Sequence, residues 1–186
     1  MFTTFIPSQY FNVAEDDDFN WNYGLSLAAS GDYKRAEETL LQVRDEAYKD
    51  EFVYIRWLAR CFIMNDKPEK AWSLYTHLKL HGHDNLLLEL IATDCYRKGY
   101  FLIAARAFDE LHTDADEKSN FPVIEGVRGA CIGVLKQFII NKNDGKHGFP
   151  KQLEQMMAIL EKYKNYQNLK ITIKKIESLL STISAE

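Results

Sequence analysis

The sequence predicts an all-α solenoid built from helical hairpins, and three observations support this fold class. Gly31 and Gly99 are 68 residues apart, and so are Ala36 and Ala104, which corresponds to two periods of about 34 residues. Apolar residues recur at steps of three and four, as they do on one face of a helix. No segment shows the alternation with a period of two that a half-buried strand requires.

A period of about 34 residues is typical of the tetratricopeptide repeat, which is a pair of helices joined by a turn. We expect three such repeats within residues 19–113. In each repeat, a small residue in the first helix faces an alanine in the second, and a bulky residue one turn after that alanine fills the gap toward the next pair. In repeat order these residues are Gly24, Ala36 and Leu40, then Ala59, Ala71 and Tyr75, then Ala92, Ala104 and Phe108.

The turns inside the pairs have their own signals. Gly31 and Gly99 suit the left-handed conformation that often ends a helix. Asp32 or Asp66 is suited to cap the helix that follows. Pro68 fits the first turn of a helix, where its missing amide proton costs little.

The N-terminal residues 1–18 are too short for a helix pair, so we interpret them as a leader or as the remnant of a preceding repeat. Their acidic run, EDDD at residues 15–18, suits the N-cap and first turn of a helix that starts near Phe19. A cation site is the alternative for this run, although most acidic runs are solvated faces.

Residues 114–186 are expected to form a linker and capping helices. HTDADEKSN (112–120) has the composition of a linker, and Pro122 is predicted to open a helix. Gly126, Gly129 and Gly133 recur in that helix at steps of three and four, which favours close packing on the preceding pair.

Two further helices complete the prediction. Pro150 is expected to start a helix that runs to about Tyr163. The last segment has apolar residues at steps of three and four and a lysine-bearing outer face, as a cap of the solenoid core requires. Those apolar residues are Leu169, Ile173, Ile176, Leu180 and Ile183.

Composition limits the function classes. The chain has 186 residues and a formal net charge of -4, which argues against nucleic acid or an anionic bilayer as the main partner. Residues 1–50 contain ten acidic and four basic residues, whereas residues 136–186 contain five acidic and nine basic residues. The three cysteines, Cys61, Cys95 and Cys131, are widely spaced in apolar segments, which favours reduced thiols in a cytosolic protein. No apolar run approaches the length of a membrane span.

Few residues are candidates for chemistry. His77 and His81 lie one helical turn apart, and His83 follows, so metal binding by these three histidines is one interpretation. The alternative is a helix end whose histidines interact with the helix dipole. The segment GVRGACIG lacks the lysine and hydroxyl residue of a phosphate-binding loop. We therefore expect no enzyme activity and no cofactor.

The remaining candidate is a protein-binding groove. On the concave face of a helical-hairpin solenoid, outward positions of the first helices line a surface that can bind a partner helix or an extended peptide. The expected lining is Trp21, Arg56, Arg60, Glu89, Tyr96 and Arg97. Arginine and aromatic residues often dominate interface energies. The alternative is that Arg56 and Arg60 pair with carboxylates of a neighbouring repeat.

Three segments carry a more specific resemblance: YIRWLARCFIMNDKPEKAWSLY (54–75), LELIATDCYRKGYF (88–101) and EGVRGACIGV (125–134). With FNWNYGLSLAASGDY (19–33), they resemble the C-terminal part of the intraflagellar transport protein 56 family, tetratricopeptide-repeat subunits of ciliary transport complex B. The resemblance includes residues that the repeat itself does not require, such as Trp57, Asn65 and Asp94. It covers about residues 19–140, with Ile124 where an aromatic residue is expected.

The resemblance implies a non-enzymatic scaffold or adaptor in the cilium and at its base. The implied partners are other complex B subunits and ciliary cargo proteins, with a role in anterograde transport and in cilium assembly or motility. Family members have more repeats upstream, so the chain resembles the last third of one. A generic tetratricopeptide adaptor for another complex is the alternative. A receptor for chaperone tails is disfavoured, because Trp21 and Leu25 stand where such a groove would require lysine and asparagine.

Overall fold

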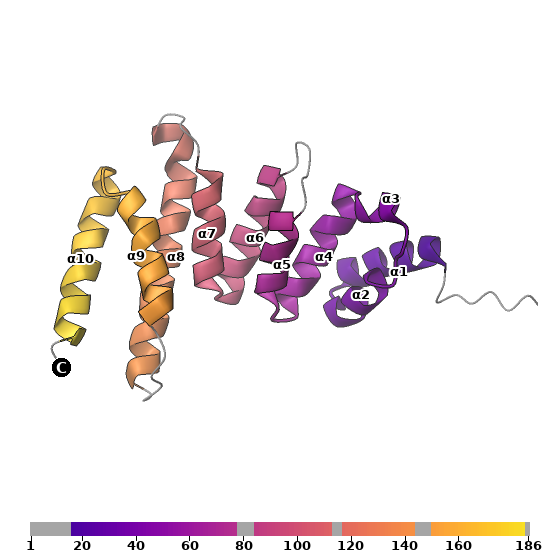
Figure 1. Cartoon of the computed structure of the whole chain (residues 1–186), viewed down its shortest axis with the longest axis horizontal. Helices are drawn as coiled ribbons and strands as arrows, with labels where there is room; N and C mark the ends of the chain where they lie inside the picture. The colour runs from indigo at the N-terminus through magenta and orange to yellow at the C-terminus, as the bar shows by residue number, and fades with distance from the viewer. Residues whose placement is uncertain (1–15, 78–83, 113–116, 144–149, 185–186) are drawn as a thin grey trace, which may run out of the picture.

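The computed structural model describes residues 16–77, 84–112, 117–143 and 150–184. Within these ranges the chain forms ten helices and no strand, so the predicted all-α class is confirmed. The helices follow one another along an elongated stack from α1 to α10 (Figure 1). They are α1 (Asp17–Ser30), α2 (Tyr33–Leu40), α3 (Glu46–Lys49), α4 (Phe52–Met64), α5 (Pro68–His77), α6 (Asp84–Lys98), α7 (Phe101–Leu111), α8 (Glu117–Asn143), α9 (Pro150–Lys162) and α10 (Gln167–Ser184).

The stack is a solenoid of helical hairpins, as the sequence predicts. The pairs α1–α2, α4–α5 and α6–α7 each pack helix against helix, and α8 and α9 form a further pair. Neighbouring pairs are joined where α2 packs on α4, α4 on α6, and α7 on α8. Helix α10 packs on α8 at the end of the stack (Figure 1). The division of the chain at residues 18 and 113 stays a prediction.

The three turns inside the first three hairpins share one conformation. Gly31 and Gly99 have φ angles of 89° and 85°, which confirms the predicted left-handed helix ends. In each turn, the amide of the left-handed residue donates to the carbonyl three residues earlier, and the next amide donates to the carbonyl five residues earlier. Asp32 caps α2 as expected, because its carboxylate accepts from the amide of Arg35 at 3.3 Å.

The expectation that Asp66 caps the following helix is wrong. Asp66 has a φ angle of 61° and occupies the left-handed position that Gly31 and Gly99 hold in the other two turns. Aspartate is one of the few residues other than glycine that adopt this conformation readily. Pro68 is the first residue of α5, as predicted.

Hydrogen bonds join the first turn to the second. Glu37 of α2 is only 4% exposed, yet both of its carboxylate oxygens have donors from the turn between α4 and α5. Asn65 Nδ2 donates to Glu37 Oε2 and Lys67 Nζ donates to Glu37 Oε1, both at 2.7 Å. Asn65 Nδ2 also lies 2.9 Å from the carbonyl oxygen of Tyr33. A buried charge is tolerated when it is paired and hydrogen-bonded in this way.

The same kind of contact joins the next turns along the stack. The Tyr100 hydroxyl donates to Asp66 Oδ1 at 2.5 Å, and Lys98 Nζ lies 3.1 Å from the same oxygen. Gln137 Nε2 of α8 donates to the carbonyl oxygen of Gly99 at 2.8 Å. Consecutive hairpins are therefore connected at their turns as well as through their apolar faces.

Small residues allow the helices to approach closely. The predicted alanines are fully buried: Ala36, Ala59, Ala71, Ala92 and Ala104. A Cβ atom built on Gly24 would lie 2.7 Å from the Leu40 side chain, so Leu40 packs against the first helix of its own pair. Phe108 fulfils its predicted role, because its ring lies against Gly126 of the next pair.

Helix α8 starts earlier than the sequence indicates. It begins at Glu117, so Pro122 lies inside the helix, and residues 117–120 of the predicted linker are helical. Pro122 is the sixth residue of this helix of 27 residues, so it removes one backbone hydrogen bond near the N-terminal end. The predicted close packing is confirmed, because Gly126, Gly129 and Gly133 lie against Phe108, Tyr96 and Phe101.

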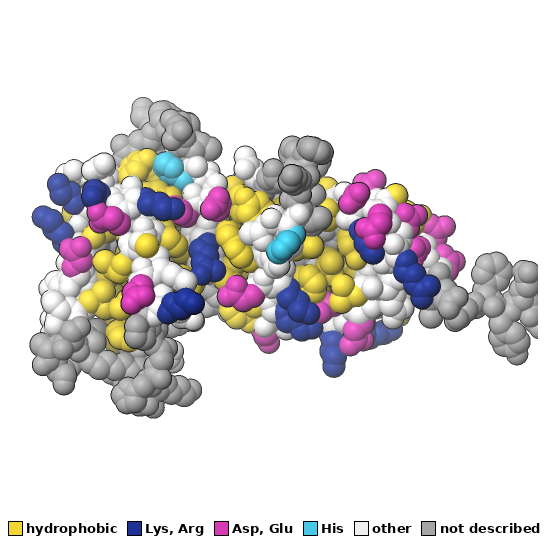
Figure 2. Space-filling view, viewed as in Figure 1, with side chains coloured by type: hydrophobic (Ala, Val, Ile, Leu, Met, Phe, Trp, Pro, Cys, Tyr) yellow, Lys and Arg dark blue, Asp and Glu magenta, His cyan; other side chains and the backbone are white. Residues whose placement is uncertain are grey.

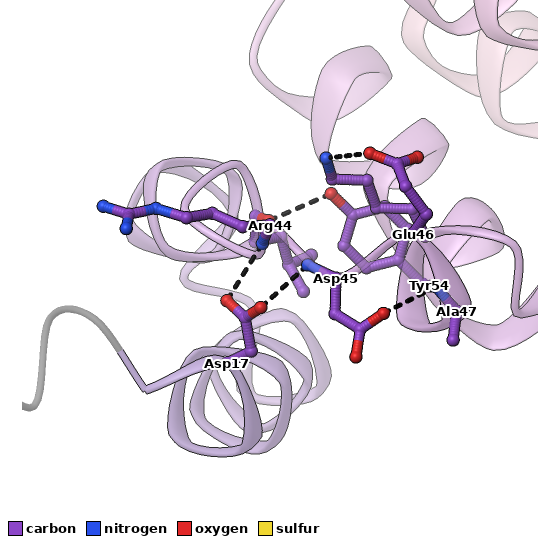
Figure 3. Close-up of polar contacts among 8 residues, drawn as sticks. Asp17, Arg44, Asp45, Glu46, Ala47 and Tyr54 are labelled. Atoms are coloured by element: carbon purple, nitrogen blue, oxygen red, sulfur yellow. Dashed lines mark hydrogen bonds and ion pairs between the residues drawn. The ribbon is translucent and has the colours of Figure 1, made fainter.

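Carboxylates of the acidic run at the N-terminal end of α1 accept hydrogen bonds from backbone amides, as Figure 3 shows for Asp17. Asp16 caps the helix by accepting from the amide of Phe19 at 3.2 Å, which confirms the predicted capping role. Asp17 accepts from the amides of Arg44 at 2.9 Å and Asp45 at 2.7 Å. The run thereby attaches the segment between α2 and α3 to the start of α1.

The C-terminal end differs from the prediction on one face. Helix α9 begins at Pro150, and α10 buries Leu169, Ile173 and Ile176 as expected. The Ile183 side chain lies outside the part of the chain that the structure describes. The outer face of α10 carries lysines, but it also exposes two large apolar side chains, so it is not the polar cap that the sequence predicts.

Candidate protein-binding groove

A groove lies between α4 and α6, the first helices of the second and third hairpins. It has a volume of ≈ 300 Å³. Its lining consists of Phe52, Arg56 and Arg60 from α4 and Leu86, Glu89, Leu90 and Thr93 from α6. Three residues of the predicted surface, Arg56, Arg60 and Glu89, are therefore brought together.

Helical spacing explains why these residues share the groove. Phe52, Arg56 and Arg60 follow one another at steps of four, so they form one stripe along α4. On α6, Leu86 and Leu90 are four residues apart, and Glu89 and Thr93 repeat that step. Because α4 packs against α6, the two stripes border the same space. The groove thus combines an apolar lining with charged residues from both helices.

Arg60 has a structural role, because its side chain contacts Asp94 and Trp57. Its Nε donates to Asp94 Oδ2 at 2.7 Å, and its guanidinium lies over the Trp57 ring at 5.5 Å from the ring centroid. Asp94 belongs to the next hairpin and is only 2% exposed. The alternative that the sequence left open, pairing with a carboxylate of a neighbouring repeat, therefore describes Arg60.

Arg56 and Glu89 differ from Arg60 in this respect. Both are exposed, and neither forms an ion pair with any residue that the structure describes. They lie on opposite helices of the groove and carry opposite charges. A side chain bound between them would meet a cation from α4 and an anion from α6, which provides directional recognition.

Trp21 lies elsewhere. Its ring stacks on Tyr48 at a centroid distance of 5.0 Å and on Tyr54 at 5.7 Å, so it is partly buried among α1, α3 and α4. The Tyr54 hydroxyl donates to the carbonyl oxygen of Leu40 at 2.9 Å. Burial raises the pKa of Tyr54 to about 12. This aromatic cluster contributes packing between the first two hairpins.

Tyr96 and Arg97 also lie outside the lining of the groove. The Tyr96 ring meets Phe101 edge to face at a centroid distance of 5.5 Å and lies against Gly129 of α8. The Arg97 side chain is 75% exposed, and its Nη1 lies 3.9 Å from Oδ1 of the buried Asp94 carboxylate. Both residues are exposed on the helix that borders the groove.

Sequence reasoning missed the apolar part of the groove. Phe52, Leu86 and Leu90 supply that part, and Leu86 is 50% exposed. The spacing of Phe52 one turn before Arg56 was the available signal. It was masked because single apolar residues in helices usually face the core.

Of the three candidate metal ligands, only His77 lies within the described residues. His77 ends α5, and its Nδ1 lies 2.7 Å from the carbonyl oxygen of Ser73. His81 and His83 lie outside the described residues. Among the residues that are described, no group of three or more histidine, cysteine or acidic side chains could hold a metal ion.

The cysteines occupy core positions. Cys61, Cys95 and Cys131 are free thiols and are fully buried, as the sequence predicts. Burial raises the pKa of each thiol to about 12. Because the thiolate is the nucleophile, buried cysteines with raised pKa values are poor candidates for catalysis.

Charge is distributed unevenly along the stack. In Figure 2, acidic side chains gather at the α1 end and basic side chains at the α10 end. This distribution agrees with the acidic residues 1–50 and the basic residues 136–186 of the sequence.

Among the helices that the structure describes, none combines the length and apolar character needed to cross a bilayer.

Comparisons with known proteins identify relatives over nearly the whole chain. A family model described as Intraflagellar transport protein 56 matches residues 3–183. The chain is also 28% identical over 181 residues to a Caenorhabditis elegans protein described as Intraflagellar transport protein 56 homolog. This similarity covers 96% of the chain and 30% of the nematode protein, so the chain spans less than a third of that relative's length.

Proposed function

The chain belongs to the intraflagellar transport protein 56 family, and we therefore propose that it is a non-enzymatic scaffold or adaptor subunit of intraflagellar transport complex B. The observation that carries the proposal is the family match over residues 3–183. In this role the chain contacts other complex B subunits and ciliary cargo proteins, and it acts in the cilium and at its base during anterograde transport. It supports cilium assembly or motility without a cofactor.

The helical-hairpin stack supports such a role. A solenoid leaves broad faces free for other proteins, because each hairpin buries its apolar stripe against its neighbours. The groove between α4 and α6 is our candidate for one contact. Arg56 and Glu89 are exposed there beside Phe52 and Leu86.

The groove favours a helix or an extended segment as its occupant. Apolar side chains of that segment would contact Phe52, Leu86 and Leu90. An acidic residue at one edge would pair with Arg56, and a basic residue at the other edge would pair with Glu89. Arg60 contributes packing area only, because Asp94 holds its guanidinium.

An affinity experiment tests the proposal. The chain is immobilised and exposed to a lysate of ciliated cells, and recovered complex B subunits are quantified by mass spectrometry. Arg56→Glu is compared with Lys34→Glu, which makes the same change of charge at an exposed position of α2 outside the groove. Arg60 is left intact, because its substitution would disturb the buried ion pair with Asp94.

We expect the unmodified chain and Lys34→Glu to recover complex B subunits, and Arg56→Glu to recover about tenfold less. Failure of the unmodified chain to recover any such subunit would contradict the assignment. A different assembly recovered in their place would favour the generic adaptor. Equal recovery by all three forms would remove the groove from the proposal and leave the assignment in place.

A further inference from the structure

Helix α10 has two opposite faces with side chains suited to packing. One face holds the buried residues Leu169, Ile173 and Ile176. The opposite face carries a stripe at steps of three and four residues, which we call the outer stripe. It consists of Ile171, Lys174, Lys175, Ser178 and Leu179.

The outer stripe is more apolar than a solvent-facing surface requires. Ile171 is 57% exposed and Leu179 is 48% exposed. They lie two turns apart along α10, and the lysine side chains lie between and beside them. A terminal helix that only shields a solenoid core needs a polar outer surface.

The position of α10 indicates what the stripe is suited to bind. The first helices α1, α4, α6 and α8 each pack against the second helix of their own pair. Helix α10 packs on α8 and is the last helix of the stack that the structure describes (Figure 1). Its outer stripe has the three-and-four spacing by which helices pack on helices.

We propose that the outer stripe of α10 binds an amphipathic α-helix of another protein, in which acidic residues flank two apolar anchors. The anchors contact Ile171 and Leu179, and the carboxylates pair with Lys174 and Lys175. The bound helix takes the place beside α10 that a second helix takes in the preceding pairs. This site is separate from the groove between α4 and α6.

Charge favours an acidic helix over a second copy of this chain. Lys170, Lys174 and Lys175 are exposed, and none forms an ion pair with a residue that the structure describes. Two copies that met through the outer stripe would place lysine against lysine, which is repulsive. An acidic partner would satisfy these lysines and gain association rate from them.

The apolar content also argues against a membrane as the occupant. An interfacial helix inserts a continuous apolar face into the bilayer. The larger apolar face of α10 is already buried in protein, and only Ile171 and Leu179 remain to be inserted. A partner helix with two apolar anchors can bury both of these side chains.

The proposal is tested with designed helical peptides and the whole chain. The acidic peptide carries two leucines spaced like Ile171 and Leu179, with glutamates on both flanks. One control peptide has lysines in place of the glutamates, and another has serines in place of the leucines. Fluorescence anisotropy measures binding, and circular dichroism verifies that each chain variant remains folded.

We expect only the acidic peptide to bind, with an affinity that falls as salt is added. Lys174→Glu with Lys175→Glu should weaken binding about tenfold, and Ile171→Ser with Leu179→Ser should abolish it. The matched control, Lys136→Glu with Lys151→Glu, changes exposed lysines of α8 and α9 and should bind as the unmodified chain does.

Four outcomes would overturn the proposal. They are absence of binding by the acidic peptide, equal binding of the lysine peptide, and equal binding by the chain with Lys174→Glu and Lys175→Glu. The fourth is occupancy by something else. In that case the unmodified chain would form a dimer or bind phosphatidylserine vesicles, and the variant with Ile171→Ser and Leu179→Ser would do neither.

Discussion

The Phe108 ring of α7 lies so close to Gly126 of α8 that a Cβ atom on Gly126 would be 2.6 Å from a ring carbon. Overpacking by the methyl group of Gly126→Ala should cost about 1–3 kcal/mol. Alanine gains about 1 kcal/mol over glycine in a helix interior, so the net loss in the free energy of unfolding should be up to about 2 kcal/mol. Urea unfolding followed by circular dichroism measures the difference.

Gly129→Ala is the matched control for that experiment. A Cβ atom at residue 129 would be 3.1 Å from the hydroxyl of Tyr96, an exposed side chain that can move. The same substitution three residues along α8 should leave stability unchanged or raise it by up to about 1 kcal/mol. A larger loss for Gly129→Ala than for Gly126→Ala would contradict the described packing.

The buried Arg60–Asp94 pair should respond unequally to removal of its two partners. Arg60→Met leaves the Asp94 carboxylate, which is 2% exposed, without its 2.7 Å partner. We expect a loss of about 3 kcal/mol. Asp94→Asn leaves Arg60, which is 26% exposed and can reach water, so the loss should be about 1–2 kcal/mol. Chemical denaturation of both variants tests this order. Equal losses would indicate that the pair is solvated.

Asp66 should make stability depend on acid pH. The Tyr100 hydroxyl and Lys98 hold the pKa of Asp66 below its ordinary value of 3.8. Because the folded-state pKa is lowered, the stabilisation is present above pH 3.8 and is lost as pH falls through the folded-state pKa. Asp66→Asn should be less stable than the unmodified chain at neutral pH, and the small difference should vanish in acid. A difference that grew as pH fell would have the wrong sign.

The conformation of Asp66 gives a second comparison. At a φ angle of 61°, alanine is strained and glycine is not. Both Asp66→Ala and Asp66→Gly lose the contacts with Tyr100 and Lys98, so their difference reports the backbone alone. Asp66→Ala should have the lower melting temperature in a thermal unfolding experiment. The reverse order would show that residue 66 is not held in the left-handed region.

The three cysteines should react with thiol reagents only after the chain opens. Cys61, Cys95 and Cys131 are buried, and burial raises the pKa of each thiol to about 12. In mildly alkaline buffer, labelling by a disulfide reagent should be slow for the native chain and rapid in guanidinium chloride. Absorbance of the released thiolate measures both rates. Rapid labelling of the native chain would place a thiol at the surface.

Arg56→Glu should weaken binding at the groove without changing the stability of the fold. Arg56 is exposed and has no ion pair with a described residue, so Arg56→Glu should change the free energy of unfolding by less than about 0.5 kcal/mol. Thermal unfolding of Arg56→Glu beside Lys34→Glu provides the measurement. A clear destabilisation by Arg56→Glu alone would assign Arg56 a structural role.

The fold could be predicted because the repeat uses local signals. Gly31, Gly99 and Pro68 mark turns and helix starts, and spaced alanines mark the helix contacts. The start of α8 could not be predicted, because Pro122 is a strong local signal for a helix start. Asn120, on the N-terminal side of that proline, is buried in the fold, and its burial does not follow from spacing within one helix.

The candidate groove could be predicted in part. Arg56, Arg60 and Glu89 line it because helical periodicity fixes which residues share a face. Periodicity does not show which aromatic neighbours meet in space. Trp21 stacks on Tyr48 and Tyr54, and Tyr96 lies against Gly129, and neither contact follows from spacing within one helix.

The uneven charge along the stack has a consequence for how the chain meets other molecules. Acidic groups concentrate near α1 and basic groups near α10, at opposite ends of an elongated body (Figures 1 and 2). Such a body carries a permanent electric dipole along its long axis. A highly charged surface exerts a torque on that dipole before any contact forms, so the molecule rotates to approach end first. Added salt weakens this torque and makes the orientation of collisions random.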